Sequence, residues 1–186
     1  MILKNNNRNQ LLVINQLPFH RFFLRPFIGC ALFLFASCGI YKFNDASIDP
    51  TIKTIKIGYI DNKARYVNPQ FAAKLTDKIQ QKIISATKLT RTNNDDADYV
   101  INGVITTYDG IQTVGVSSLQ ANTNRLTVSV HMTWKNNKTN KLEEFDVSRS
   151  FDYPASQSFT VAEAQLADEA VKTLTDDIFN RIFSNW

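Results

Sequence analysis

One segment, residues 125–135, constrains the fold of this chain more than any other. Its large apolar residues alternate with small polar ones: Leu126, Val128, Val130, Met132 and Trp134 against Thr127, Ser129, His131 and Thr133. Because successive side chains of a β-strand point to opposite faces, the segment predicts a strand with one buried face and one hydroxyl-rich face. A sheet built around this strand needs a covering layer on its apolar side, and the other side is left to water or to a polar partner.

Two helical segments supply that layer. The first begins at Asn68-Pro69, since Asn caps free amides and Pro at the first helical position lacks the amide that would stay unpaired, and its apolar residues recur every three or four positions to about Ser85. The second begins at a predicted capping box, Thr160 with Glu163, and continues toward the end of the sequence. Its apolar face is expected to close the core, with partner binding as the alternative: Ile178, Phe179, Ile182, Phe183 and Trp186.

Alternation also predicts strands near residues 53–60, 88–92, 97–108 and 142–153. The third has apolar residues on both faces, which is typical of an interior strand. Arg149 interrupts the alternation of the fourth, and residues 136–141 fit a hairpin turn that precedes it. The expected fold class is therefore α+β: a two-layer sandwich of a mostly antiparallel four- to five-stranded sheet with two helices packed on one face.

Residues 109–124 are rich in Gly, Ser, Thr, Asn and Gln and predict a long loop. Loops of this length usually have a function or are disordered. We expect this loop and the turn at 136–141 to lie at opposite or adjacent ends of the sheet and to contact a partner, with Leu119 and Lys138 as the positions to test.

The charge of the chain is unevenly placed. Lys and Arg outnumber Asp and Glu by 21 to 17, but Lys4, Arg8, Arg21 and Arg25 all precede the first acidic residue, Asp45, and without these four the counts are equal. An excess confined to a removable end is not the basic surface that nucleic-acid binding requires. We therefore expect no nucleic-acid partner.

An uncharged apolar run at residues 26–40 follows the basic segment, as in an export signal. At about 15 residues it is shorter than the roughly 20 that a membrane-spanning helix needs. Ala36 and Ser37 before Cys38 are typical of a lipobox, although Phe35 stands where Leu is usual. Cleavage there would leave a diacylglycerol and an N-acyl chain on Cys38, and no other cofactor is expected.

This interpretation divides the chain into a signal peptide (1–37), a lipidated tether (38–52) and one α+β domain (53–186). An ordinary secretory signal and cleavage at Cys30 are the alternatives. No Asp follows Cys38, a pattern typical of outer-membrane delivery. The expected location is the periplasmic side of the outer membrane, held by the lipid anchor.

No residue pattern supports catalysis, and we expect a protein that is not an enzyme. Residues 38–186 hold one histidine, His131, expected at the surface, and one cysteine, expected to be acylated, so no metal site is predicted. The acidic cluster at residues 94–98 lacks the Gly and the distant Glu of a calcium loop, so it predicts a solvated turn.

Four stretches together resemble the lipopolysaccharide-assembly lipoprotein family, LptE, in its Bacteroidota form. They are Cys38-Gly-Ile-Tyr-Lys-Phe, Ala97-Asp-Tyr-Val-Ile-Asn-Gly-Val-Ile, Arg125-Leu-Thr-Val-Ser-Val and Asp177-Ile-Phe-Asn-Arg-Ile-Phe-Ser-Asn-Trp186. The resemblance covers residues 38–186. It implies an outer-membrane lipoprotein that plugs the LptD β-barrel, helps that barrel to assemble and binds lipopolysaccharide.

The site residues follow as expectations. Lipopolysaccharide phosphates favour Lys and Arg, so the candidates are turn residues, with solvated charges as the alternative: Lys88, Arg91, Lys135, Lys138 and Lys141. The candidate surface for an LptD-like barrel is the polar strand face: Thr127, Ser129, His131 and Thr133. The alternative function is a periplasm-facing adaptor lipoprotein of another envelope complex, such as a cell-wall synthase activator or part of a secretion channel.

Overall fold

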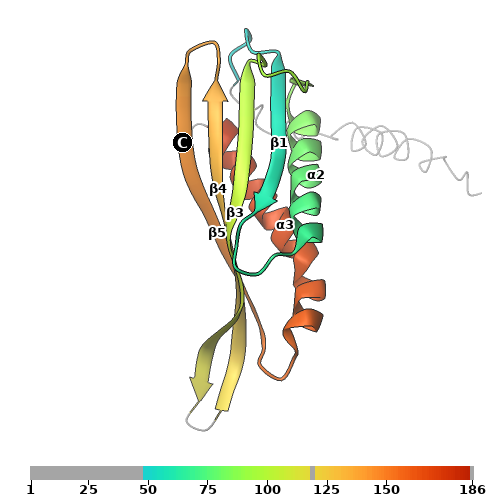
Figure 1. Cartoon of the computed structure of the whole chain (residues 1–186), viewed down its shortest axis with the longest axis vertical. Coiled ribbons are helices and arrows are strands. Elements are labelled where there is room, and N and C mark those ends of the chain that lie inside the picture. The colour runs from blue at the N-terminus through green and yellow to red at the C-terminus, as the bar shows by residue number, and fades with distance from the viewer. Residues whose placement is uncertain (1–47, 118–119, 185–186) are drawn as a thin grey trace, which may run out of the picture. The chain divides into compact units, whose positions relative to one another are not determined.

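The computed structural model describes residues 48–117 and 120–184. In the labels of Figure 1, the elements are β1 (Thr54–Asn62), α2 (Pro69–Ala86), β2 (Thr90–Arg91), β3 (Tyr99–Ser117), β4 (Gln120–Asn136), β5 (Lys141–Pro154) and α3 (Phe159–Phe183). Both helices cover one face of a five-stranded sheet, so the expected α+β two-layer sandwich is confirmed. The predicted signal peptide, Cys38, Leu119 and Trp186 lie outside the described residues.

The sheet has the strand order β2-β1-β3-β4-β5. β1 is parallel to β2 and to β3, while β3, β4 and β5 are antiparallel neighbours, so the sheet is mostly antiparallel. β3 is the central strand, and the prediction of an interior strand at 97–108 is confirmed.

The core lies between the sheet and the two helices. Leu126, Val128, Val130 and Met132 on β4 are fully buried, as their alternation predicts. From the helices they meet the residues Phe71, Leu75, Ile79, Ile83, Leu174 and Ile178. Full burial of such a side chain contributes about 1.5–3 kcal/mol, so this layer supplies the main driving force for the fold.

The start of α2 is confirmed and the predicted start of α3 is wrong. Asn68 accepts a hydrogen bond from the backbone amide of Phe71 at 3.0 Å, directly before Pro69. α3 begins earlier than the supposed capping box, with Ser158 at the N-cap and no side-chain capping hydrogen bond. Glu163 is buried and hydrogen-bonds to side chains of other elements, so its carboxylate is not available to cap the helix.

The predicted loop at 109–124 is also wrong, because β3 and β4 continue through it as a long hairpin. Gln112 pairs with Arg125 and Thr113 with Asn124, with bulges between Asp109 and Gln112 and beyond Thr113. The polar composition of residues 109–124 suggested a loop. Backbone hydrogen bonds between the two strands of a hairpin do not require apolar side chains, so a polar segment can still form strands. This hairpin and the turn at 136–141 lie at opposite ends of the sheet, as one of the two expected arrangements (Figure 1).

Candidate partner-facing surface

We call the side chains of β3, β4 and β5 that point away from the helices the polar sheet face. Thr127, Ser129, His131 and Thr133 lie on it and are half-buried, between the fully buried residues of the same strand. Their partners on β5 are polar as well: Ser150, Ser148, Asp146 and Glu144. The structure therefore brings the four predicted residues together with a matching row on β5 that was not among the predicted site residues.

Cross-strand hydrogen bonds connect the two rows. The hydroxyls of Thr127 and Ser150 are 3.0 Å apart, and those of Ser129 and Ser148 are 2.8 Å apart. Each hydroxyl can donate one hydrogen bond and accept two, so one cross-strand bond leaves capacity for a partner. The side chains are held in place before any partner binds, which lowers the entropy lost on association.

Ionisable side chains also interact across the two strands on this face. His131 Nδ1 lies 2.9 Å from Asp146, and its Nε2 lies 3.9 Å from Glu144. Arg125 donates from Nε and Nη2 to Asp152 at 2.6 and 2.9 Å, and these hydrogen bonds hold the pKa of Asp152 below its usual value. Hydroxyls, carboxylates, a histidine and an arginine thus share this face, which suits a polar partner surface better than an apolar one.

The five candidate lipopolysaccharide residues all lie toward the end of the sheet where β1 begins and β4 turns into β5. They do not form one cluster. Lys138 is paired with Asp98 at 3.1 Å, and Lys141 is paired with Glu143. Of the described residues, none forms an ion pair with Lys88, Arg91 or Lys135.

The prediction of a solvated turn at residues 94–98 is right for the exposed residues 94–96 and wrong for Asp98. Asp98 is buried and accepts hydrogen bonds from the backbone amides of Lys53 at 2.7 Å and Thr54 at 3.0 Å. The Lys53 amide is the largest cause of a pKa of Asp98 far below the usual value. Asp98 therefore fixes the start of β1 against β3, and Lys138 belongs to this structural group.

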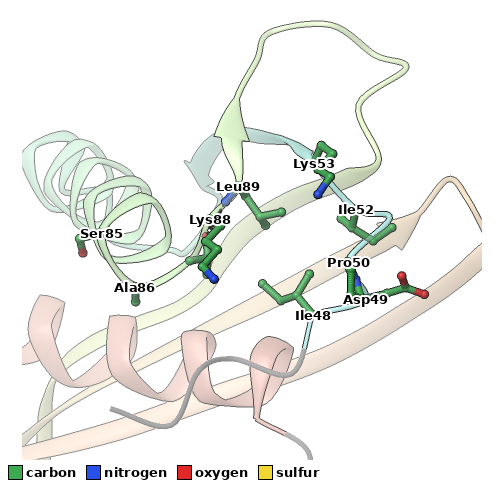
Figure 2. A pocket seen from close by; sticks show the side chains of 10 residues that line it. Ile48, Asp49, Pro50, Ile52, Lys53, Ser85, Ala86, Lys88 and Leu89 are labelled. Carbon is green, nitrogen blue, oxygen red and sulfur yellow. Dashed lines mark hydrogen bonds between the residues drawn. The ribbon is translucent and has the colours of Figure 1, made fainter. Parts of the chain in front are cut away.

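A pocket of about 540 Å³ lies at the same end, and we call it the tether pocket (Figure 2). Apolar side chains from the segment before β1 and from the segment between α2 and β2 line it together with two lysines: Ile48, Ile52 and Leu89 with Lys53 and Lys88. Apolar walls beside ammonium groups suit an amphiphile with an anionic head. Lys88 is the candidate lipopolysaccharide residue that this pocket includes.

At the opposite end, Glu163 joins three segments that sequence reasoning did not connect. It accepts hydrogen bonds from Tyr108 at 2.9 Å, Asn68 at 2.6 Å and Tyr66 at 3.2 Å. Burial, followed by the Glu163 contact, raises the pKa of the Tyr108 hydroxyl well above its usual value. The start of α2, the start of α3 and the middle of β3 are thus held together.

Beside this group lies a second pocket, of about 570 Å³, which we call the edge pocket. Arg65, Tyr66, Tyr108, Ile111 and Phe159 line it together with the backbone around Gly110. The rings of Tyr66 and Phe159 are 5.4 Å apart in an edge-on arrangement. Gly110 is required here, since a Cβ at this position would lie 1.9 Å from Phe159 Cε2.

Residues 48–117 and 120–184 contain no group of three His, Cys, Asp or Glu side chains arranged to hold a metal ion. Across the same residues, no helix has the length and apolar content that a bilayer crossing requires. Ile178 and Phe183 are buried and Phe179 and Ile182 pack beside them, so for these four residues the role in the core is confirmed.

Comparison with known protein families shows which family this chain belongs to. A family model described as LptE, lipopolysaccharide-assembly, matches residues 52–182. The chain belongs to the LptE family. The description of this family names an assembly role and no reaction. Among curated proteins, none matches this chain.

One solved structure supports the fold, and two others are similar to a lesser degree. A minor lipoprotein from Acinetobacter baumannii aligns with a TM-score of 0.50 and 16% identity, covering 72% of this chain and 94% of that one. Lipoprotein B from Nitrosomonas europaea aligns at 0.48 and 13%, covering 72% and 83%. The rare lipoprotein B from Shewanella oneidensis aligns at 0.44 and 12%, covering 70% and 90%. All three are bacterial lipoproteins by name, and the first shows the shared architecture.

Proposed function

We propose that this LptE-family chain is the lipoprotein subunit of an outer-membrane lipopolysaccharide translocon. Acyl chains on Cys38 hold it on the periplasmic side of that membrane. Its polar sheet face lies against the inner wall of an LptD-like β-barrel, which it plugs and helps to assemble. It also binds lipopolysaccharide during transport.

The observation that carries this proposal is the polar sheet face, considered with family membership. Large membrane barrels have polar interiors, so a protein inside one needs a broad hydrogen-bonding surface. Here the rows of β4 and β5 offer hydroxyls, carboxylates and a histidine over four consecutive cross-strand pairs, from Thr127 with Ser150 to Thr133 with Glu144. The equal numbers of basic and acidic residues after residue 37 leave the domain without a net charge that a charged wall would repel at long range.

Lipopolysaccharide binding is assigned to the end of the sheet that holds the tether pocket. Lys88 lines that pocket, and Arg91 and Lys135 lie near the same end, on β2 and β4. Lys138 is a weaker candidate than the sequence suggested, because Asp98 holds its ammonium group. The apolar part of the pocket would accept acyl chains, and the cations would accept phosphates.

Co-purification tests the barrel interaction. The tagged full-length chain, isolated from detergent-solubilised outer membrane, should retain a large β-barrel. Ser148→Trp places a bulky group on the polar sheet face, where Ser148 is exposed, and should reduce the barrel recovered. Gln81→Trp, at an exposed position on α2, is the matched control and should not. Recovery of only a peptidoglycan synthase would contradict the proposal and favour an adaptor lipoprotein.

A further inference from the structure

β3 continues far beyond the strand that pairs with it on one side. β1 ends at Asn62, which is in register with Ile105, and the amide of Lys63 donates to the Ile105 carbonyl at 3.0 Å. β3 runs on to Ser117, paired only with β4 (Figure 1). Within the part of the chain that the structure describes, no strand pairs with the β1 side of β3 beyond Ile105. We call residues 106–114 on this side the open edge.

An unpaired edge invites another strand unless it is protected, and charged side chains or proline are the usual protection. The outer edge of β5 has this protection: Glu143, Glu144, Asp146, Arg149, Asp152 and Pro154. The open edge of β3 carries a single charge, Asp109, among Thr, Tyr, Gly, Ile, Gln and Val. These two edges are therefore built differently, and of the two the open edge is the one suited to pairing.

The edge pocket lies directly beside the open edge. Thr106, Thr107, Tyr108, Asp109, Gly110 and Ile111 belong to both. Ile111 is 73% exposed and Tyr66, across the pocket, is 46% exposed, so apolar surface faces solvent next to an edge that no described strand pairs. Two backbone groups of this edge are already bound by side chains: the Gly110 carbonyl accepts from the Tyr153 hydroxyl, and the Ile111 amide donates to Asp109 Oδ1 at 3.2 Å. Glu163 fixes the hydroxyls of Tyr66 and Tyr108, which keeps these two walls of the pocket in place.

An unpaired strand beside a side-chain pocket is the arrangement by which proteins bind extended peptides. Backbone hydrogen bonds provide affinity, and the pocket selects a side chain. We propose that the open edge binds an extended segment of a partner protein, which adds a strand beside β3 and inserts an aliphatic or aromatic side chain into the edge pocket.

We take this partner to be the LptD-like β-barrel, a choice that rests on the proposed function. Strands in the wall of a closed barrel are already paired on both sides, so they have no free backbone groups to offer. The segment that binds β3 must therefore come from a loop or a terminal extension of the barrel chain. The polar sheet face and the open edge then contact different parts of the same partner.

Photo-crosslinking with register mapping tests this inference. Benzoylphenylalanine replaces Ile111 or Thr113, two exposed positions two residues apart, in the full-length chain in cells. A third variant carries it at Ser148 on the polar sheet face. We expect Ile111 and Thr113 to crosslink to one short segment of the barrel, at positions two residues apart, because neighbouring strands keep register.

The outcomes separate the inference from the proposed function. If the barrel is retained and Ser148 crosslinks to it, but positions 111 and 113 do not, the inference is wrong and the proposed function stands. Crosslinks from 111 and 113 to a second copy of this chain also overturn the inference. If no barrel is retained, the proposed function fails, and the partner named here fails with it.

A substitution gives an independent measurement. Ile111→Glu adds a charge at an exposed position of the open edge, and we expect about tenfold less barrel in the co-purified complex, the change that about 1.4 kcal/mol would produce. Ile84→Glu on α2, also at an exposed position, is the matched control and should leave recovery unchanged. Equal recovery with both variants would overturn the inference.

Discussion

Arg149 on β5 reaches across to α3 and forms a two-point ion pair with Asp177. Its Nη2 donates to Asp177 Oδ1 at 2.8 Å, and its Nε donates to the other carboxylate oxygen. Arg149 points to the helix side of the sheet between Val147 and Phe151, where the alternation of β5 calls for an apolar residue. The interruption of the pattern is thus a link between the two layers.

Arg149→Ala should lower the urea midpoint of unfolding by more than Arg125→Ala. Both arginines make two-point pairs, and exposure alone does not rank them, since Asp177 is less exposed than Asp152 but Arg149 is more exposed than Arg125. The Arg149 pair joins β5 to α3, whereas the Arg125 pair joins two strands that backbone hydrogen bonds already hold together. Urea titrations of the two variants and the parent chain measure the difference. The difference in urea midpoint between the two variants should become smaller in about 1 M salt, where the Debye length is only about 3 Å. Equal urea midpoints of the two variants in low salt would show that the Arg149–Asp177 pair stabilises the fold no more than the Arg125–Asp152 pair.

Glu163→Ala should destabilise the fold by about 2–3 kcal/mol, because buried hydroxyl and amide groups lose their acceptor. Glu169→Ala, at an exposed position on the same helix, should change stability little. Denaturant unfolding of both variants is the measurement. If the two variants unfold alike, Glu163 does not hold the three segments together.

Stability should fall as the pH rises above about 10, and Tyr108→Phe should flatten that fall. The pKa of Tyr108 is raised in the folded state, chiefly by burial, so above the ordinary tyrosine pKa the unfolded chain loses its proton first. The contribution of the protonated Tyr108 hydroxyl to the free energy of unfolding is therefore complete below about pH 10 and is lost as the pH rises further. Urea midpoints between pH 8 and pH 11 measure the slope, with Tyr59→Phe at an exposed position as control. An unchanged slope in Tyr108→Phe would contradict this account.

Asp98→Asn should destabilise the chain at pH 7 by about 1.5–3 kcal/mol, the range for hydrogen bonds to a charged group, and by much less near pH 2. The folded pKa of Asp98 lies well below the ordinary value near 4, so the carboxylate contributes stability above pH 4 and loses it as the pH falls. Chemical unfolding at several pH values tests this. Asp96→Asn, at an exposed position in the same turn, is the control and should have no comparable effect.

The double variant Lys88→Glu/Arg91→Glu should weaken binding of purified lipopolysaccharide by about tenfold or more at low salt, since cations that meet phosphates are replaced by anions. Lys138→Ala should leave binding unchanged, because its ammonium group is held by Asp98. A fluorescence titration compares these variants with Lys172→Glu, an exposed position on α3. A loss caused by Lys138→Ala and not by the double variant would move the site to the turn between β4 and β5.

Local patterns were sufficient for most of the fold. The alternation around Val128 and Val130 and the start of α2 at Asn68 depend on neighbours in sequence, and the structure confirms both. The sequence motif at Glu163 was misread, because its hydrogen-bond partners lie 55, 95 and 97 residues away in the chain. A local motif does not contain contacts at that separation.

Some features of the candidate site could also be predicted from the sequence, and others could not. The polar row on β4 was predictable from period-two alternation, and its matching row on β5 required the register. Asp98 looked like part of a solvated turn because burial of a carboxylate depends on which amides the fold directs at it. The hairpin at 109–124 looked like a loop because polar composition hides strand pairing that only the backbone partner reveals.

The length of the β3–β4 hairpin determines how far its tip lies from the end of the sheet where residue 48 is located. β3 has 19 residues, and at about 3.3 Å per residue it extends roughly 60 Å, about twice the thickness of the hydrocarbon core of a bilayer. Residue 48, where the described chain begins, lines the pocket at the other end of the sheet from the hairpin. In a molecule held by a lipid ahead of residue 48, strand length would set the depth that the hairpin reaches, and each two-residue deletion from both arms would withdraw it by about 7 Å.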